Sequence, residues 1–360
     1  MLTEILMGLF VIAFFAMILI KSRGNSGDEY LSKAQTNALK GICATAVVLH
    51  HYARYVGGSV LFMQFQWCAG WVVGTFFFIS GYGLMHQYLH KADYIETFPR
   101  KRLGALLTPY IIVLLVWCTI YVVYYRSVTP LMKQFAALTG GGTVVPYSWY
   151  VLLILLMYIV FYFAARRSKR LMDGGRGIII TSTAFCVLWM TAAYLLEFPR
   201  WWYNTCLCFA LGLTWARYRE NVETFLRKGR RSCFCFVLSL IIFALSFGYR
   251  CISLERPGAF SVLPHALIAL LELGFAIIEP ASFVICLVLI LRRFTLVNKV
   301  SSYIGSLSYE IYLTHGIPIM LLRDYFRPRL VLGLLITLAI TYLSALILKA
   351  AASLVTQKRA

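Results

Sequence analysis

Charged side chains are scarce in this sequence, and acidic ones are the scarcest. Asp, Glu, Lys and Arg make up 13% of the 360 residues, and only 14 residues are acidic, whereas soluble domains carry about 25% charged residues. The hydrophobic fraction is 61%, against about 45–50% in soluble domains. A chain of this length could form two soluble domains, but it has too little charge to cover their surfaces. The composition therefore excludes a large soluble domain and indicates a membrane protein.

Apolar runs close to the ~20 residues that cross a bilayer dominate the chain. They predict an all-α, polytopic membrane helix bundle of ten core spans plus one extra N-terminal span. The runs cover residues 2–20, 39–56, 69–89, 104–125, 148–165, 178–196, 202–218, 232–249, 264–291, 303–321 and 330–348. We assign residues 1–38 to an N-terminal anchor span and cytoplasmic linker, and residues 39–360 to the membrane domain. The first run has no preceding basic residues and no small-residue cleavage site, so we expect it to be retained.

Positive charge is plentiful but unevenly distributed. The net charge is +20, and 25 of the 34 Lys and Arg residues fall in alternate connections between the runs. Because an excess of Lys and Arg marks the cytoplasmic side, the N-terminus is expected outside and the C-terminus in the cytoplasm of a cell membrane. No basic stripe accompanies a nucleic-acid-binding motif, so membrane lipid is an expected partner and nucleic acid is not.

Cysteine spacing gives no sign of a metal site. The ten cysteines are scattered and no Cys-x-x-Cys motif occurs, which disfavours zinc. Most are expected to be small residues of the packed core. Cys68 and Cys251 both fall near the predicted outer surface, so a disulfide between them is an open alternative that spacing cannot decide.

The run 39–56 carries a phased polar stripe. Lys40 and His51 are eleven residues apart, so they project from one helix face about 16 Å apart along the axis, and Arg54 extends the stripe. A cation thus lies at the predicted cytoplasmic entrance, an imidazole in the outer half and a guanidinium at the outer rim. A histidine bonded at the headgroup interface and a catalytic histidine are both compatible with this pattern.

Small residues recur in the run 69–89, which contains the segment GWVVGTFFFISGYGLM. Gly70, Gly74 and Gly81 have the spacing that lets another helix backbone approach closely, and Ser80 adjoins Gly81. Two interpretations remain open: tight helix packing, and a groove in which a narrow chain could lie.

Basic residues stand at the cytoplasmic entrance of the next run. Arg100, Lys101 and Arg102 occur in the segment FPRKRLGALLTPY. Positive charge at the cytoplasmic surface would alone explain them. They would also form a rim that binds phosphate through charge-assisted hydrogen bonds.

The tenth run also carries a polar stripe. In SLSYEIYLTHGIPI, the side chains of Ser308, Tyr312 and His315 share one helix face. The predicted topology places His315 in the outer half of the membrane, as it does His51. Two histidines at one depth can bind a metal, but no third ligand has metal spacing, so we predict no metal site.

Four ordered segments resemble the acyltransferase type 3 family, the multi-span bacterial enzymes that O-acylate surface glycans and related acceptors. The segments are Lys40-x10-His51, GTFFFISGYGL (74–84), RKRLGALLTPY (100–110) and SLSYEIYLTHGIPI (306–319). The likeness covers residues 39–348, and SWYVLL (148–153) fits a further, weaker feature. Each segment alone is unspecific, whereas the ordered set is not.

The resemblance implies an acyl-CoA-dependent O-acyltransferase. The expected donor is cytoplasmic acyl-CoA, with acetyl-CoA foremost, and the expected acceptor is a hydroxyl of a cell-surface glycan or lipid-linked sugar. No permanently bound cofactor is implied. The resemblance assigns His51 as catalytic base, Lys40 to the basic position of the signature, Arg102 to coenzyme contact, His315 as a second site histidine and Ser80 to the acyl channel.

The chain departs from the family pattern at one point. The family often has Arg-x-x-Arg before the proline, but here Ala105 stands three residues after Arg102. Coenzyme binding must then use Arg100, Lys101 or another connection. Arg54 is a candidate for stabilising the oxyanion of the tetrahedral intermediate, as a positioned cation does.

Two rival functions remain. A proton-coupled transporter or flippase of a small or lipid-linked solute would use Glu272, Glu279 and Glu310, because intramembrane acids are costly and usually functional or paired. Pairing of Glu279 or Glu272 with an arginine is the structural alternative. A transporter does not explain the phasing of Lys40 and His51. A non-catalytic sensor or scaffold has no supporting feature.

Overall fold

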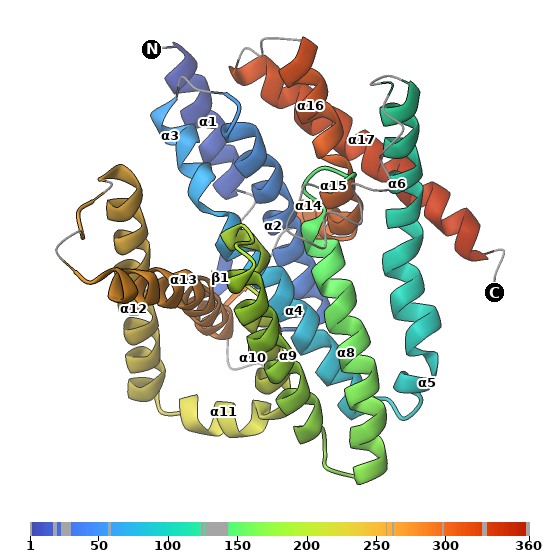
Figure 1. Ribbon diagram of the computed structural model, residues 1–360, viewed down its shortest axis with the longest axis vertical. Helices are drawn as coiled ribbons and strands as arrows, with labels where there is room; N and C mark the ends of the chain where they lie inside the picture. The colour runs from blue at the N-terminus through green and yellow to red at the C-terminus, as the bar shows by residue number, and fades with distance from the viewer. Residues whose placement is uncertain are drawn as a thin grey trace. The chain divides into compact units, whose positions relative to one another are not determined.

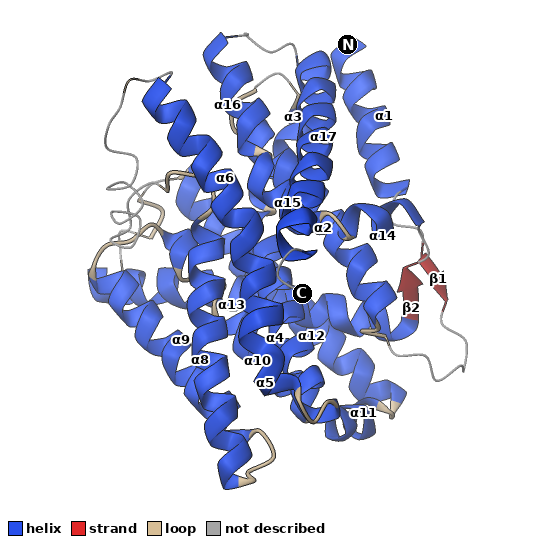
Figure 2. Cartoon of the chain, turned by 90° about the vertical axis from the view of Figure 1, so that its right-hand side faces the viewer, coloured by secondary structure: helices blue, strands red, loops and turns tan. Residues whose placement is uncertain are grey.

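The computed structural model describes residues 2–16, 20–22, 30–56, 59–123, 126, 143–256, 258–260, 263–296, 299–325 and 330–357. Helices account for nearly all of them, and Figure 2 shows two short strands beside the helices. The strands β1 (Ile20–Ser22) and β2 (Phe294–Leu296) pair antiparallel, with Lys21 opposite Thr295. The predicted all-α class is confirmed.

Figure 1 traces the helices in chain order by colour. They are α1 (Leu2–Ala16), α2 (Lys33–Ala53), α3 (Val60–Met63), α4 (Ala69–His90), α5 (Tyr94–Phe98), α6 (Gly104–Val123), α8 (Trp149–Leu171), α9 (Arg176–Leu195), α10 (Leu207–Arg217), α11 (Arg219–Leu226), α12 (Gly229–Glu255), α13 (His265–Arg293), α14 (Lys299–Gly305), α15 (Ser308–Thr314), α16 (Gly316–Tyr325) and α17 (Leu330–Gln357). Shorter helical turns are η1 (Gln64–Trp67), η2 (Pro99–Leu103) and η4 (Arg200–Trp202).

The chain divides into two compact units. Unit 1 comprises Met1–Val72, Thr97–Leu156 and Phe294–Ala360, and unit 2 comprises Val73–Glu96 and Met157–Arg293. In unit 1, α2 packs against α14 and α15, and α17 packs against α6, α15 and α16. In unit 2, α12 packs against α13, and α10 packs against α9 and α13.

Several helices are long and apolar enough to cross a membrane, as the composition predicts. Among the described residues there are six: Tyr94–Val123, Trp149–Leu171, Arg176–Leu195, Gly229–Glu255, His265–Arg293 and Val331–Val355. A seventh is obtained if Val60–Trp67 and Ala69–His90, which bend by 43°, form one span. The protein is therefore a multi-pass membrane protein, but the predicted count of ten core spans plus one is not confirmed.

Two of the predicted spans that are not confirmed contain only short helices. α10 occupies the predicted run 202–218 but has only 11 residues, about 16 Å at 1.5 Å per residue, against a hydrocarbon core of about 30 Å. The predicted continuous span over 303–321 is divided among α14, α15 and α16. Hydropathy located these segments correctly but did not reveal where their helices end.

Helix α2, which carries Lys40 and His51, is fixed at its N-terminal end. The Ser32 hydroxyl accepts a hydrogen bond from the backbone N–H of Gln35 at 3.3 Å and caps the helix. The Gln35 amide donates to the Leu296 carbonyl at 3.2 Å and accepts from the Leu296 N–H at 2.8 Å, so the start of α2 is joined to β2.

Glycines let α2 and α14 approach backbone to backbone. A Cβ on Gly41 would lie 1.9 Å from the carbonyl oxygen of Ser301, and a Cβ on Gly305 would lie 1.8 Å from that of Asn37. No other residue fits at either position without separating the helices. This crossing sets the position of α2 one residue beyond Lys40.

Candidate active site

His51 lies in the last turn of α2, three residues before the C-cap Arg54. The helix is unbroken from Lys33 to Ala53, so the predicted placement of Lys40 and His51 on one helix is confirmed. His51 is partly buried, whereas Arg54 is exposed.

The structure brings His51 and His315 together. Their ring centroids are 5.1 Å apart, and the ring of Tyr147 stacks on His51 at 3.9 Å and on His315 at 5.3 Å. His51 comes from α2, His315 from the junction of α15 and α16, and Tyr147 from the turn before α8. We call these three side chains the histidine cluster. All three belong to unit 1.

One hydrogen bond fixes the tautomer of His315. Its Nδ1 lies 2.7 Å from the Tyr312 carbonyl oxygen, which can only accept, so Nδ1 carries the proton and Nε2 holds the lone pair in the neutral ring. The side chain is 0% exposed. Its Nε2 is buried and makes no hydrogen bond within the part of the chain that the structure describes.

His51 has a buried ring nitrogen of the same kind. Its Nδ1 has no hydrogen-bond partner among the described residues. The neighbouring His50 is different, because its Nδ1 bonds to the Phe65 carbonyl oxygen at 3.2 Å. Buried polar atoms are normally paired, so the two open nitrogens of His51 and His315 are available to a bound molecule. An imidazole with an open nitrogen can take a proton from a hydroxyl group.

The predicted coenzyme contacts lie in unit 1 as well. Lys40 is partly buried, and Arg102 is near enough to act on it electrostatically. Arg100, Lys101 and Arg102 are exposed on η2, the π-helical turn that begins at Pro99 and leads into α6. Three cations thus stand at the start of α6, in a position suited to phosphate groups.

Ser80 lies on α4 in unit 2 and is partly buried. Its glycine neighbours have packing roles. A Cβ on Gly81 would lie 2.1 Å from the Phe209 carbonyl oxygen of α10, and one on Gly74 would lie 3.1 Å from Pro280 of α13. The tight-packing interpretation of these two glycines is therefore correct, while a role of Ser80 in an acyl channel stays a prediction.

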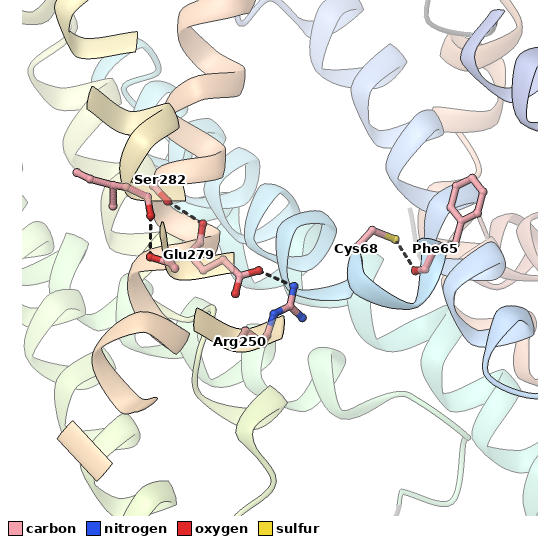
Figure 3. A network of polar contacts seen from close by, with 7 residues as sticks. Phe65, Cys68, Arg250, Glu279 and Ser282 are labelled. Carbon is pink, nitrogen blue, oxygen red and sulfur yellow. Dashed lines mark hydrogen bonds and ion pairs between the residues drawn. The ribbon is translucent and has the colours of Figure 1, made fainter. Parts of the chain in front are cut away.

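The three glutamates considered for a transporter differ in burial and pairing. Glu279 is buried and forms a 2.7 Å ion pair with Arg250 of α12, which Figure 3 shows. Glu272 is exposed, and Glu310 is partly buried. The structural interpretation, pairing with an arginine, is confirmed for Glu279.

All ten cysteines lie among the described residues, and all are free thiols. Figure 3 also shows the Cys68 thiol donating a hydrogen bond to the Phe65 carbonyl oxygen at 3.1 Å. The alternative of a disulfide between Cys68 and Cys251 is not supported. Within the described residues there is no group of three or more His, Cys, Asp or Glu side chains that could hold a metal ion.

Sequence reasoning missed Tyr147, which contacts both histidines. The residue has a positive φ of 63°, and its hydroxyl is hydrogen-bonded to that of Tyr55 at 2.7 Å. No spacing in the sequence links Tyr147 to His51, 96 positions earlier. The available hints were its place between Pro146 and the SWYVLL segment and the polar stripe that contains Tyr312.

Comparison with known proteins identifies the family of the chain. The family model described as an acyltransferase domain, that of the acyltransferase type 3 family, matches residues 34–350, nearly the whole chain. The protein belongs to this family and is a membrane acyltransferase. Comparisons with curated proteins and with solved structures returned no match.

Proposed function

We propose that this protein transfers an acyl group, acetyl in the first instance, from cytoplasmic acyl-CoA to a hydroxyl of an extracytoplasmic glycan or glycolipid. The observation that carries the proposal is the histidine cluster. It places two imidazoles within 5.1 Å of each other, each with a buried nitrogen that bonds to no described residue. Acyl transfer to a hydroxyl requires such a proton acceptor.

His51 acts as the general base. It takes the proton of the acceptor hydroxyl while the hydroxyl oxygen attacks the thioester carbonyl. The new C–O bond forms, the C–S bond breaks, and the proton passes from the imidazolium to the departing coenzyme sulfur. General base catalysis of this kind contributes about 10²–10⁴ in rate. His315, with its Nδ1 committed to the Tyr312 carbonyl, is the second site histidine, and Arg54 is the candidate for oxyanion stabilisation.

The coenzyme binds from the cytoplasmic side. Its phosphates stay in water, where they bind Arg100, Lys101 and Arg102. Moving charged phosphates into hydrocarbon would cost a large desolvation free energy. Lys40 stands on the same helix as His51, about 16 Å away along the axis. The narrow pantetheine arm spans this interval and carries the thioester toward His51. A role of Ser80 in the acyl channel stays a prediction of the resemblance.

The orientation follows from the charge distribution. With the basic connections in the cytoplasm, the C-terminus is cytoplasmic and the N-terminus is outside, in a plasma membrane. His51 then lies in the outer half of the membrane, where a glycan hydroxyl can reach it. The transporter alternative is not favoured, because the most buried of its acids, Glu279, is neutralised by Arg250.

Acyl transfer is tested with the purified full chain in detergent, radiolabelled acetyl-CoA and glycan acceptors. His51→Ala should abolish labelling of the acceptor, while the protein keeps its expression level and thermal stability. His265→Ala is the matched control, because His265 is exposed at the start of α13, and it should retain full activity. An active His51→Ala protein would overturn the assignment.

Coenzyme binding is tested separately with Arg102→Ala. Loss of one phosphate contact should raise the KM for acetyl-CoA more than it lowers kcat, since the contact is made equally in the ground and transition states. A lower kcat with unchanged KM would place Arg102 outside the coenzyme site. Mass spectrometry of surface glycans from wild-type and deletion cells would identify the acceptor.

A further inference from the structure

Tyr147 has an uncommon backbone conformation that holds its ring against the two histidines. Its φ of 63° lies in the left-handed region that side-chain-bearing residues rarely adopt. Such conformations persist only where surrounding contacts impose them, and they cluster at functional sites. The contacts around Tyr147 therefore show what imposes it.

Three elements of unit 1 fix the position of Tyr147. Its hydroxyl is hydrogen-bonded at 2.7 Å to that of Tyr55, just after α2, and its carbonyl oxygen accepts a hydrogen bond from the Tyr312 hydroxyl of α15. On the third side, a Cβ on Gly316 of α16 would lie 3.5 Å from the Tyr147 ring and 3.0 Å from Pro146. Tyr147 is thus held by Tyr55 just after α2, by α15 and by the start of α16 together.

The Tyr147 ring supplies the orientation that a hydrogen bond usually gives to a catalytic histidine. A working imidazole is normally fixed by a bond from its second nitrogen, as His315 is fixed by the Tyr312 carbonyl. The Nδ1 of His51 makes no such bond to any described residue. Instead, the Tyr147 ring stacks on that of His51, with the ring centroids 3.9 Å apart and an angle of 28° between the planes.

We propose that Tyr147 is the positioning residue for His51, acting through its ring, and that the hydrogen bond to Tyr55 is only a minor restraint on that ring. This inference rests on the proposed function, in which His51 is the base. The stack sets the plane of the imidazole, so its ring nitrogens keep a constant direction relative to the acceptor. A displacement of about 1 Å at a reacting group can cost about 10²-fold in rate.

Variants of Tyr147 distinguish the contribution of its ring to kcat from that of its hydroxyl. Tyr147→Phe keeps the stack and should keep kcat within about 5-fold of wild type, whereas Tyr147→Leu removes the stacking ring and should lower kcat by about 10²-fold. The KM for acetyl-CoA should stay within about 2-fold in both, because the coenzyme phosphates bind elsewhere. Tyr55→Phe, which removes the same hydrogen bond from the other side, should match Tyr147→Phe.

Three results would overturn the inference. One is a Tyr147→Leu enzyme with wild-type kcat, and another is a Tyr147→Phe enzyme as slow as Tyr147→Leu, which would make the hydroxyl the active group. The third is a loss of kcat accompanied by an equal rise in KM. Thermal unfolding of each variant shows whether it is folded. If Tyr147→Leu does not fold, Tyr147→His and Tyr147→Gln are compared instead. Tyr147→His keeps a flat ring and should retain more activity than Tyr147→Gln.

The proposed function can fail separately. If His51→Ala remains active, the general base has been misassigned and the positioning role of Tyr147 falls with it. If His51→Ala is inactive while Tyr147→Leu is as active as wild type, the proposed function stands and only the positioning inference is wrong.

Discussion

Replacing Gly41 by alanine should disturb the whole helix that carries the proposed base. A Cβ at this position would lie 1.9 Å from the Ser301 carbonyl oxygen, whereas real Cβ contacts essentially never fall under 3.0 Å. The backbones of α2 and α14 would have to separate by about 1.1 Å, the difference between these distances. Neither side can yield by rotating a side chain, because the atom that obstructs the Cβ belongs to the backbone.

The separation should be visible in both stability and rate. Overpacking of this kind costs about 1–3 kcal/mol, which corresponds to a fall in Tm of about 2–6 °C for a large chain. Because His51 moves with α2, a shift of about 1 Å should also lower kcat by about 10²-fold.

Thermal unfolding in detergent and the radiolabelled transfer assay measure the two effects. Gly248→Ala is the matched control, because Gly248 lies inside α12 with nothing within 4 Å of an added Cβ. It should be as stable as wild type or more so, since alanine is the better helix former. A Gly41→Ala protein with wild-type Tm and kcat would refute the close crossing of α2 and α14.

The remaining predictions concern unit 2. Glu279→Ala should destabilise the protein by about 3–5 kcal/mol, because it removes the carboxylate that neutralises the partly buried Arg250 guanidinium. The double variant with Arg250→Met should recover most of this loss in thermal unfolding, and no recovery would show that the pair is not coupled. Although burial raises the pKa of the Asp173 carboxyl, hydrogen bonds from the Ser168 hydroxyl and from backbone N–H groups, that of Gly175 among them, lower it, and the net shift is downward. A lowered pKa adds stability above the unfolded value of about 3.9 that is lost as the pH falls through the folded value. Asp173→Asn should therefore lower Tm at pH 7, and the gap to wild type should narrow below about pH 4; a gap that does not change with pH would refute the assignment.

Periodicity was enough to place Lys40 and His51 on one helix. Eleven residues are close to three full turns, and this relation holds wherever the segment is helical, as it is in α2. The pairing of Glu279 with an arginine was also foreseen as an alternative, because an unpaired carboxylate in hydrocarbon is costly. The sequence did not show which arginine pairs with Glu279, because Arg250 lies on a different helix.

The continuity of the tenth run was predicted wrongly. Its hydropathy is that of one span, yet α14 ends at Gly305 and α16 begins at Gly316. Gly305 at the end of α14 meets the backbone of α2 at Asn37, and Gly316 and Pro318 follow the second break.

Composition and the helical period were enough to predict a membrane protein, its helical class and the polar stripes on individual helices, because these properties depend only on residue content and local chain geometry. Only the tertiary structure decided that His51 and His315 meet, and that Tyr147 stacks on both. These rings come from positions far apart in the chain, and their meeting depends on helix crossings and on one left-handed backbone angle. Such contacts follow from packing of the whole unit, which no local pattern encodes.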